Sequence, residues 1–194
     1  MPSSVKDIER IVRSAWLRLP ASHRALLEAI GASQHSVVDE PIGAAVVALR
    51  MSAGLPGLSP EERVKLDGAL GVWDAQTRSV LIDASHPLLV GLHGVALERF
   101  VARIAWHEWG HALSVARCSR DDIAAGRGLL AKSPPGVRSN IRAAGYRPSS
   151  YTHEVVAEIY AMLMERLVRD ETGRPEWLDE QIYELVMRVT GWNE

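Results

Sequence analysis

The stretch that decides the fold is His107-Glu108-Trp109-Gly110-His111, which spells His-Glu-x-x-His inside a segment, 95–116, that reads as a helix. Residues four positions apart lie one above the other on the same helix face. His107 and His111 can therefore present two imidazole nitrogens to a single Zn²⁺. Glu108 follows the first ligand, where its carboxylate can reach a metal-bound water and accept a proton. The motif predicts a catalytic zinc site.

The residues that lead into the motif place both histidines on an apolar face. An apolar stripe at helical spacing is formed by Leu97, Phe100, Val101 and Ile104. His107 and His111 continue this stripe, three and then four residues further along. We therefore expect both imidazoles to point inward, into a cleft that shields a metal from solvent.

A catalytic zinc site needs three protein ligands and one open position for water. The longer motif with a third histidine is excluded, because Ser114 and Arg117 occupy its glycine and histidine positions. Two acids further along the chain, Glu154 and Glu158, are four residues apart and share one helix face. One of them can bind zinc while the other orients a ligand imidazole. The spacing leaves their order open.

The segment that carries these two acids predicts a second helix, from about residue 152 to residue 169. Thr152 can cap the N-terminus of this helix, and Ser149 and Ser150 are nearby substitutes. The small side chains of Ala157 and Ala161 allow another helix to approach closely. Most of the surrounding positions are apolar, which distinguishes the two acids from those of an ordinary solvated helix face: Val155, Val156, Ile159, Met162 and Leu163.

The first motif is followed about forty residues later by Glu-x-x-Ala-Glu-x-Tyr-Ala, at 154–161, and the combination resembles the gluzincin group of zinc metallopeptidases. It is most similar to the small ImmA/IrrE-like, minimal-gluzincin branch, which has Glu-x-x-Ala-Asn-x-Phe-Ala there. The resemblance covers roughly residues 66–161. It implies a zincin-like fold, in which a small twisted sheet packs on the active-site helix and a second helix carries the third ligand.

Carried over residue by residue, the resemblance makes His107 and His111 zinc ligands, Glu108 the general base and Glu154 the third ligand. The asparagine of the family falls on Glu158, which keeps an acceptor but adds a charge. The register of the motif ranks Glu154 above Glu158 as the ligand. Glu158 is then a neighbour of the ligand set, or the alternative third ligand.

Upstream of the motif, residues 71–83 predict two short strands about a turn at 74–77. In gluzincins a small sheet precedes the motif helix and its edge strand pairs with an extended peptide substrate, so the resemblance makes one of these strands that edge. Backbone hydrogen bonds would then hold the peptide while pockets read alternate side chains. A plain structural hairpin is an equally good interpretation of either strand.

Peptide hydrolysis also needs a donor for the oxyanion that develops on the scissile carbonyl. Four side chains that flank or belong to the second motif are candidates: Tyr146, Tyr151, His153 and Tyr160. Tyr151 and His153 come first as catalytic residues, because they are nearest in sequence to Glu154.

Composition narrows the choice of partners and compartment. The chain has 194 residues, 47% of them hydrophobic and 24% charged, which suffices for a core of its own. A net charge of −2 without a basic tract excludes an electrostatic nucleic-acid surface. No apolar run suits a membrane span or a signal peptide, and the single Cys118 excludes an intramolecular disulfide. We expect a cytoplasmic protein with neither nucleic acid nor membrane as partner.

The rest of the chain is read as mostly helical, which predicts an α+β fold. A strand is expected at 36–39 or at 44–48. Ser4 and Asp7 have the spacing of a capping box for a helix at 4–18. Further helices are expected at 21–30, from 59 onward, 120–131, 137–144 and 175–190. We divide the chain into an N-terminal helical region, 1–58, and a zincin-like metallopeptidase domain, 59–194. The first region is either a lobe or lid over the cleft or part of the same unit.

These patterns predict a zinc-dependent endopeptidase that holds one Zn²⁺ per chain and cleaves a peptide or protein substrate with a metal-activated water and Glu108 as base. Two other functions stay open: a catalytically silent zinc-binding regulatory or interaction module, and a helical binding domain in which the motif is accidental. A purely structural zinc prefers four closed protein ligands, so the intact motif glutamate favours catalysis. No feature of the sequence points to an oligomeric state.

Overall fold

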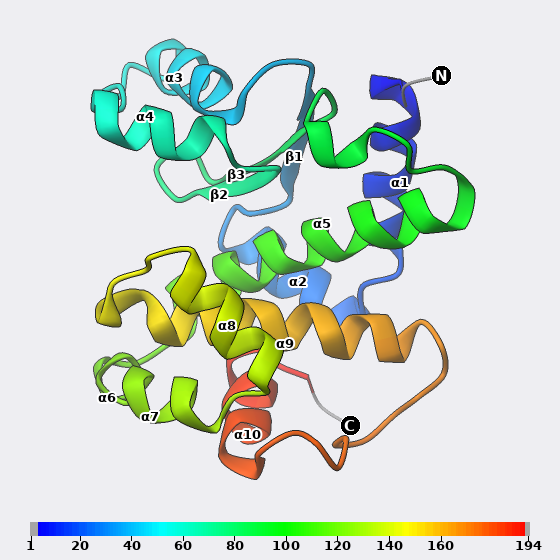
Figure 1. Ribbon diagram of the computed structural model, residues 1–194, viewed down its shortest axis with the longest axis vertical. Helices are drawn as coiled ribbons and strands as arrows, with labels where there is room; N and C mark the ends of the chain where they lie inside the picture. Colours follow the sequence, from blue (N-terminus) through cyan, green and yellow to red (C-terminus); the bar gives the residue numbers. More distant parts are fainter. Residues whose placement is uncertain (1–3, 193–194) are drawn as a thin grey trace.

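In the computed structural model, which describes residues 4–192, a small mixed sheet lies on a much larger set of helices (Figure 1). The strands are β1 (Gln34–Val38), β2 (Gly71–Asp74) and β3 (Ser79–Asp83). The α-helices are α1 (Val5–Leu17), α2 (Ala21–Ala29), α3 (Ile42–Ser52), α4 (Pro60–Asp67), α5 (Gly94–Arg117), α6 (Arg120–Ala124), α7 (Gly126–Lys132), α8 (Pro135–Ala143), α9 (Tyr151–Leu167) and α10 (Glu180–Thr190). The expected α+β class with a helical majority is confirmed.

The sheet has the order β1-β3-β2, with β3 parallel to β1 and antiparallel to β2. The predicted hairpin at 71–83 is therefore confirmed, and β2 forms one edge of the sheet. Side chains of a strand alternate between its two faces. Val80 and Ile82 of β3 enter the main core, whereas Leu81 enters a smaller cluster beneath α3. Both faces of the central strand are thus covered, which explains why β3 is buried along its whole length.

The N-terminal region contributes to the same sheet and core. Of the two expected strand positions, 36–39 overlaps β1, whereas 44–48 lies inside α3. Apolar residues of α3 recur at helical spacing and cover the sheet face away from α5: Ile42, Ala45, Val46 and Leu49. Helix α1 packs on α5 and on β1. Its expected capping box is present, since Ser4 and Asp7 exchange hydrogen bonds at the N-terminus of the helix.

Three sequence-based boundaries are wrong, the first two because a tertiary contact decides the local structure and the third because of a local cap. Thr152 does not cap α9: Ser150 occupies the N-cap position without a side-chain hydrogen bond, and Thr152 lies within the helix, where its hydroxyl donates to the Asp122 carbonyl (2.7 Å). The helix expected at 120–131 is divided into α6 and α7 next to Gly126, whose backbone approaches Thr152. The last helix begins at Glu180, because Asp179 accepts a hydrogen bond from the Gln181 N–H and caps it there.

Helix α5 runs through the middle of the molecule, between the sheet and α9 (Figure 1). The expected apolar stripe of α5 is only partly buried. Leu97 and Val101 are buried, whereas Phe100 and Ile104 are half-buried. Other faces of the helix are buried as well, through Ala102, Ala105, Trp106, Trp109, Ala112 and Leu113. This broad burial follows from the position of α5, which packs against α1, α9, α10 and the sheet.

Helices α5 and α9 approach each other most closely at Gly110. A Cβ atom at this position would lie 2.8 Å from the Cα of Ala157 and 3.2 Å from Cδ1 of Tyr160. Ala157 and Ala161 are fully buried, in agreement with the close helix approach expected from their small size. Gly110 belongs to the His-Glu-x-x-His motif, and Ala157 lies one turn after Glu154, so this contact sets the distance between the two motifs.

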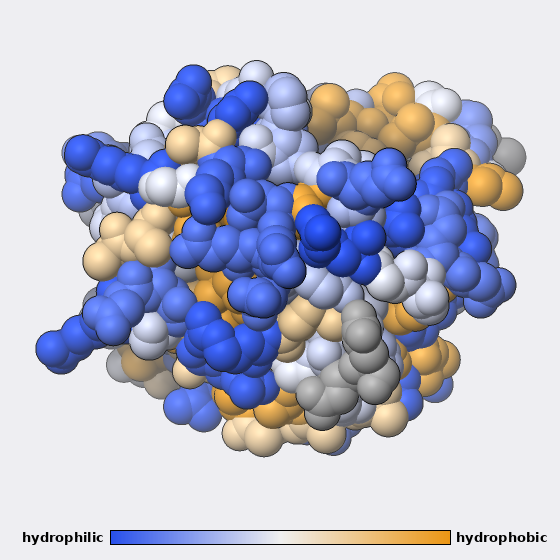
Figure 2. Space-filling model, turned by 90° about the horizontal axis from the view of Figure 1, so that it is seen from below, coloured by the Kyte–Doolittle hydropathy of each residue, from blue (hydrophilic) through white to orange (hydrophobic). Residues whose placement is uncertain are grey.

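The surface carries both hydrophilic and hydrophobic side chains, as the composition of the chain predicts. Figure 2 shows the end of the molecule at which α10 lies, where hydrophilic side chains predominate and apolar ones are scattered between them. Within residues 4–192, no helix combines the length and the apolar character needed to cross a bilayer.

The contact at Gly110 leads to a stability prediction. Gly110→Ala should lower the free energy of unfolding by about 1–3 kcal/mol, because the added methyl forces the two helix backbones apart. Gly128→Ala is the matched control: the position lies in α7, and a Cβ there meets no atom within 4 Å. This control should be neutral or slightly stabilising. Urea unfolding of the metal-free proteins measures both, and equal stability of the two variants would contradict the packing argument.

Candidate metal centre

The two histidines of the first motif lie on one face of α5, one turn apart. Their Nε2 atoms are 2.9 Å from each other, and the rings meet nearly edge to face, at an interplanar angle of 82°. Burial lowers the pKa of His107 and lowers that of His111 further, and the neighbouring His107 and His153 add to the latter shift. Both imidazoles are therefore held neutral, which is the form that binds a metal.

Glu154, in the first turn of α9, completes a group of three ligands. Its Oε2 lies 3.6 Å from Nε2 of His111, and one ligand atom from each of His107, His111 and Glu154 lies within 4.8 Å of the others. Tetrahedral ligands at roughly 2.0–2.1 Å from zinc are about 3.3 Å apart. The observed separations of 2.9 and 3.6 Å lie on either side of this value. The donor set and its spacing therefore fit a single Zn²⁺.

The charge state of Glu154 also fits a cation. The side chain is 7% exposed, and burial raises its pKa to about 8, although a hydrogen bond from the Tyr146 hydroxyl and the nearby Lys65 act in the opposite direction. A buried carboxylate without a full counter-charge is costly unless it is paired or bound to a metal. Glu154 is such a group.

Glu108 lies on the side of the metal ligands that faces the sheet. It is 7% exposed and burial raises its pKa to about 8, with smaller contributions in the same direction from Glu154 and Glu158. The backbone N–H of Trp73, in the edge strand β2, donates a hydrogen bond to its carboxylate. At Gly71 the strand approaches so closely that a Cβ would lie 3.2 Å from Cγ of Glu108.

Glu158 has a different environment from Glu154. Arg103 of α5 donates from Nη2 to Glu158 Oε2 (3.2 Å) and from Nη1 to Glu165 Oε2 (3.3 Å). Glu158 lies outside the group of three ligand atoms, but close enough to His107 to raise the pKa of that imidazole. Of the two acids that the spacing left open, the structure thus brings Glu154 to the histidines and pairs Glu158 with an arginine.

The ligands and Glu108 line one cavity of about 570 Å³ between the sheet and the helices below it. Its walls come from α4, from the segment that leads into β2, from β2 itself, from α5 and from the chain around Tyr146. The lining residues are Lys65, Leu66, Gly68, Ala69, Gly71, Val72, Trp73, Ala75, His107, Glu108, His111, Val115, Ala144, Tyr146 and Glu154. Of these residues, Lys65 was not predicted to belong to the site, and Tyr146 was only one of four candidate oxyanion donors.

The four candidate oxyanion donors lie in different places. Tyr146 lines the cavity, and its hydroxyl donates to Glu154. The lining does not include Tyr151 or His153, and Nδ1 of His153 is hydrogen-bonded to the buried Ser114 hydroxyl (2.6 Å). Tyr160 is fully buried on another face of α9, where its hydroxyl lies 2.9 Å from Nδ1 of His23. Proximity in sequence to Glu154 favoured Tyr151 and His153, whereas a loop brings Tyr146 to the ligand from further away.

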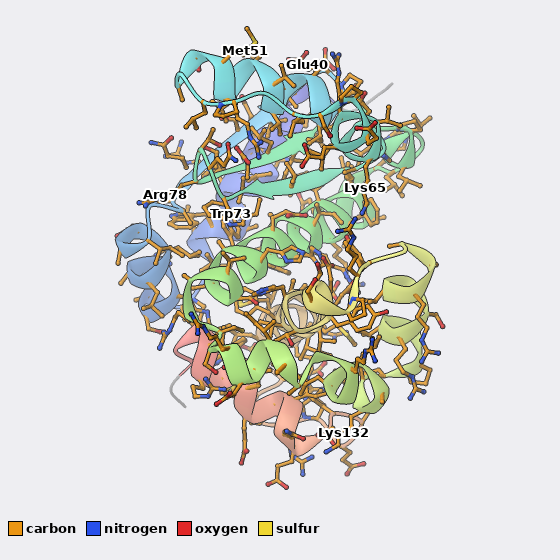
Figure 3. All side chains as sticks on the ribbon, turned by 90° about the vertical axis from the view of Figure 1, so that its left-hand side faces the viewer. Glu40, Met51, Lys65, Trp73, Arg78 and Lys132 are labelled. Atoms are coloured by element: carbon orange, nitrogen blue, oxygen red, sulfur yellow. The ribbon has the colours of Figure 1, made fainter. Side chains whose placement is uncertain are left out.

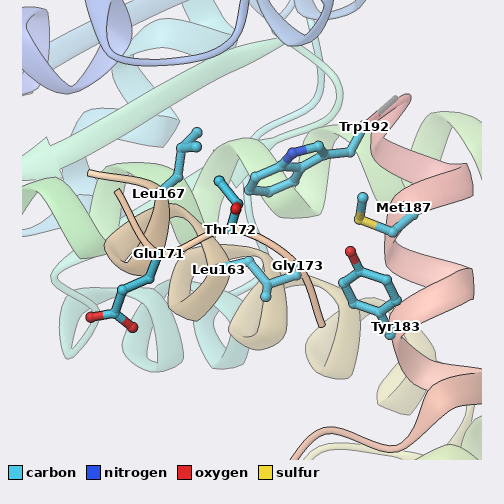
Figure 4. Close-up of a pocket in the computed structure, with 8 residues that line it drawn as sticks. All are labelled: Leu163, Leu167, Glu171, Thr172, Gly173, Tyr183, Met187 and Trp192. Carbon is cyan, nitrogen blue, oxygen red and sulfur yellow. The ribbon is translucent and has the colours of Figure 1, made fainter. Parts of the chain in front are cut away.

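A second cavity, of about 410 Å³, lies between α9, the segment after it and α10 (Figure 4). Its lining is mostly apolar and consists of Leu163, Leu167, Glu171, Thr172, Gly173, Tyr183, Met187 and Trp192. The one acid in this lining, Glu171, forms ion pairs with Arg166 (2.9 Å) and Arg169 (3.2 Å). This cavity offers no set of ligands for a cation.

Of the ionisable groups in residues 4–192, His107, His111 and Glu154 alone form a set of three or more with the spacing of a metal site. A scan against protein-family models and searches of curated proteins and of solved structures found no match to the chain. An inference about function therefore rests on the geometry of this centre.

Proposed function

We propose that this protein is a zinc-dependent endopeptidase. The observation that carries the proposal is the meeting, in one cavity, of three metal-ligand atoms and a separate buried carboxylate, Glu108, which is adjacent to them but not one of them. A structural zinc site closes its coordination with four protein ligands, whereas a catalytic site has three and keeps a fourth position open. Three ligands beside a spare acid match the catalytic pattern.

His107, His111 and Glu154 would hold the zinc. Bound Zn²⁺ supplies a Lewis acid that polarises the scissile carbonyl, lowers the pKa of water and favours the ionised forms of the neighbouring acids. Glu158, paired with Arg103, lies next to His107 and supports the orientation of that ligand from outside. Arg103 compensates the charge that distinguishes Glu158 from the asparagine of the gluzincin pattern.

Glu108 acts as the proton carrier. Hydrolysis adds the oxygen of water to the carbonyl carbon and breaks the carbon–nitrogen bond, so one proton has to move from water to the leaving amine. Glu108 accepts that proton during attack and donates it to the amine as the bond breaks. The hydrogen bond from the Trp73 N–H favours its ionised form and fixes the side chain in the cavity.

Tyr146 is the donor that we assign to the developing oxyanion. Its hydroxyl already lies at Glu154, inside the cavity, and is therefore within reach of a carbonyl bound near the ligands. His153 and Tyr160 have their own partners in Ser114 and His23, and Tyr151 lies outside the lining. This assignment replaces the ranking of donors by their sequence distance from Glu154, which placed Tyr151 and His153 first.

Strand β2 is proposed to bind the substrate backbone. It pairs with β3 along one edge only, and Gly71, Val72 and Trp73 line the cavity. An extended peptide added to the open edge would gain backbone hydrogen bonds and pass beside Glu108. The arrangement of sheet, motif helix and second ligand helix supports a zincin-like fold. A peptide or protein is then the substrate.

Metal analysis tests the ligand set. The wild type should bind close to one zinc per chain, and His111→Ala and Glu154→Ala should both lose it, because each removes one of three ligands. Glu158→Gln should keep the zinc. Elemental analysis after addition of zinc and dialysis measures all four proteins. Loss of zinc in Glu158→Gln alone would transfer the ligand role to that residue, and a wild type that binds no zinc would overturn the proposal.

The role of Glu108 is tested by Glu108→Gln, which keeps the shape of the side chain and removes the base. Zinc content should be unchanged, and cleavage of a quenched fluorescent peptide library should fall by about 10²–10⁴-fold. Glu9→Gln, the same change on the exposed face of α1, is the control and should retain full activity. A Glu108→Gln protein with wild-type cleavage would remove Glu108 as the base.

Zinc affinity should depend on pH through Glu154. In a Glu108→Gln background, Glu154, whose pKa is about 8 in the metal-free protein, has to lose a proton before it binds. Affinity should therefore rise by about tenfold per pH unit between roughly pH 6.5 and 8 and level off above this range. The histidines, whose pKa values are lowered, are already neutral there.

Competition with a chromophoric chelator measures this dependence. Glu108→Gln combined with Glu154→Gln is the control, and its weaker affinity should vary little with pH. The same slope in both proteins would show that Glu154 is not the group that titrates.

A further inference from the structure

The rim of the metal cavity carries a positive charge for which the peptidase mechanism has no use. Lys65 of α4 lines this cavity, and among the described lining residues it is the only lysine or arginine. Figure 3 shows Lys65 at the level between the sheet and the helices below it, well apart from Trp73. Strand β2 begins at Gly71, shortly after Lys65 in the chain. Gly68 and Ala69, which lie between these two residues in sequence, also line the cavity.

The ammonium group of Lys65 forms no ion pair within the described residues, although it is near enough to Glu154 to lower the pKa of that acid. Its Nζ lies 5.5 Å from the centroid of the Tyr146 ring, a cation–π contact that joins α4 to the opposite wall. Within residues 4–192 no carboxylate lies at ion-pair distance from this Nζ. Of the three acids of its own helix, Asp67 pairs with Arg63 (3.9 Å) and Glu62 accepts from the backbone N–H of Ser59 (2.9 Å), while Glu61, one turn before Lys65, forms no ion pair with it.

The charges of the cavity explain what this lysine can attract. Glu108 and Glu154 lie at the floor, and a divalent cation held there balances both of them. Lys65 then remains as a positive charge without an ion pair at the exposed rim, where its flexible stem can follow a ligand. Most other lining residues are apolar or glycine. A negatively charged group on a bound peptide would find its complement at Lys65.

We propose that Lys65 selects substrates that carry a carboxylate close to the scissile bond. This inference rests on the proposed peptidase function and adds a substrate class to it. The carboxylate has two sources with the same chemistry: an aspartate or glutamate side chain of the substrate, or the free C-terminus of a short peptide. Tyr146, which contacts both Lys65 and Glu154, keeps the ammonium near the reacting groups.

Cleavage profiling of a peptide mixture tests the proposal with four zinc-loaded proteins: wild type, Lys65→Gln, Lys65→Glu and Lys132→Gln. Lys132 undergoes the same change of charge but lies in α7, far from the cavity (Figure 3). The mixture is supplied with free and with amidated C-termini, which separates the two sources of the carboxylate. A matched pair of cleaved peptides, Asp or Glu against Asn or Gln, then gives kcat and KM separately.

The wild type and Lys132→Gln should prefer the carboxylate peptides by about three- to tenfold, the range of an exposed ion pair, chiefly through KM. Lys65→Gln should abolish this preference, so that kcat/KM becomes about equal for the carboxylate and the amide peptides, and Lys65→Glu should favour basic peptides instead. Binding of the same pair to zinc-loaded Glu108→Gln protein, followed by tryptophan fluorescence, should reproduce the preference without turnover.

Three results would overturn the inference, and they differ in what else they affect. Wild-type cleavage without a preference for carboxylates, or a preference that survives in Lys65→Gln, removes the role of Lys65 and leaves the peptidase in place. A wild type that holds zinc but neither cleaves nor binds any peptide overturns the proposed function and, with it, the substrate class.

Discussion

The close contact between α5 and α9 at Gly110 is the constraint on which the candidate site depends. With a Cβ excluded at 2.8 Å from the Ala157 backbone, the two helices are held at a distance that only glycine opposite alanine permits. The contact lies between His107 and His111 on one helix and one turn from Glu154 on the other. Candidate ligands that are more than forty residues apart in sequence are brought to within 4.8 Å where these two helices pack, and the closest backbone contact between them is apolar.

The buried acids of the same region are expected to destabilise the folded protein. Two carboxylates, Glu108 and Glu154, are both 7% exposed, and burial raises the pKa of each to about 8. Arg103 shows that the fold can compensate half-buried acids where no metal is needed, because it pairs with Glu158 and Glu165 on the neighbouring helix. Acids left without such a partner beside two neutral imidazoles are typical of a functional site rather than of a structural network.

Local patterns in the sequence were enough to predict much of this structure. The hairpin at 71–83, the capping box at Ser4 and the helix that carries the first motif all depend on nearest neighbours along the chain. The positions that could not be predicted depend on contacts between segments. Thr152 has the residue type of an N-cap, but the Asp122 carbonyl takes its hydroxyl instead. The break between α6 and α7 has the same origin, since Gly126 packs on Thr152.

The residues of the candidate site also differ in whether a local sequence pattern predicts them. Motif spacing singled out His107 and His111, because helical periodicity places residues four apart on one face, together with the adjacent Glu108. Spacing left Glu154 and Glu158 open as the third ligand, and only the resemblance ranked Glu154 first. Lys65, which reaches the cavity from α4, was not predicted at all. Tyr146, which reaches it from a loop and belongs to no periodic pattern, was only one of four candidate donors and not ranked first.

The edge strand β2 lines the same cavity as the residues that spacing predicts and those that it does not. Its Trp73 N–H holds the carboxylate of Glu108, and its Gly71 lies against the Cγ of that residue. A peptide paired with β2, as we propose, would lie on the backbone that also contacts Glu108. Binding of such a substrate and positioning of the proposed proton acceptor would then be coupled through one strand of four residues, whose place is fixed by its pairing with the buried β3.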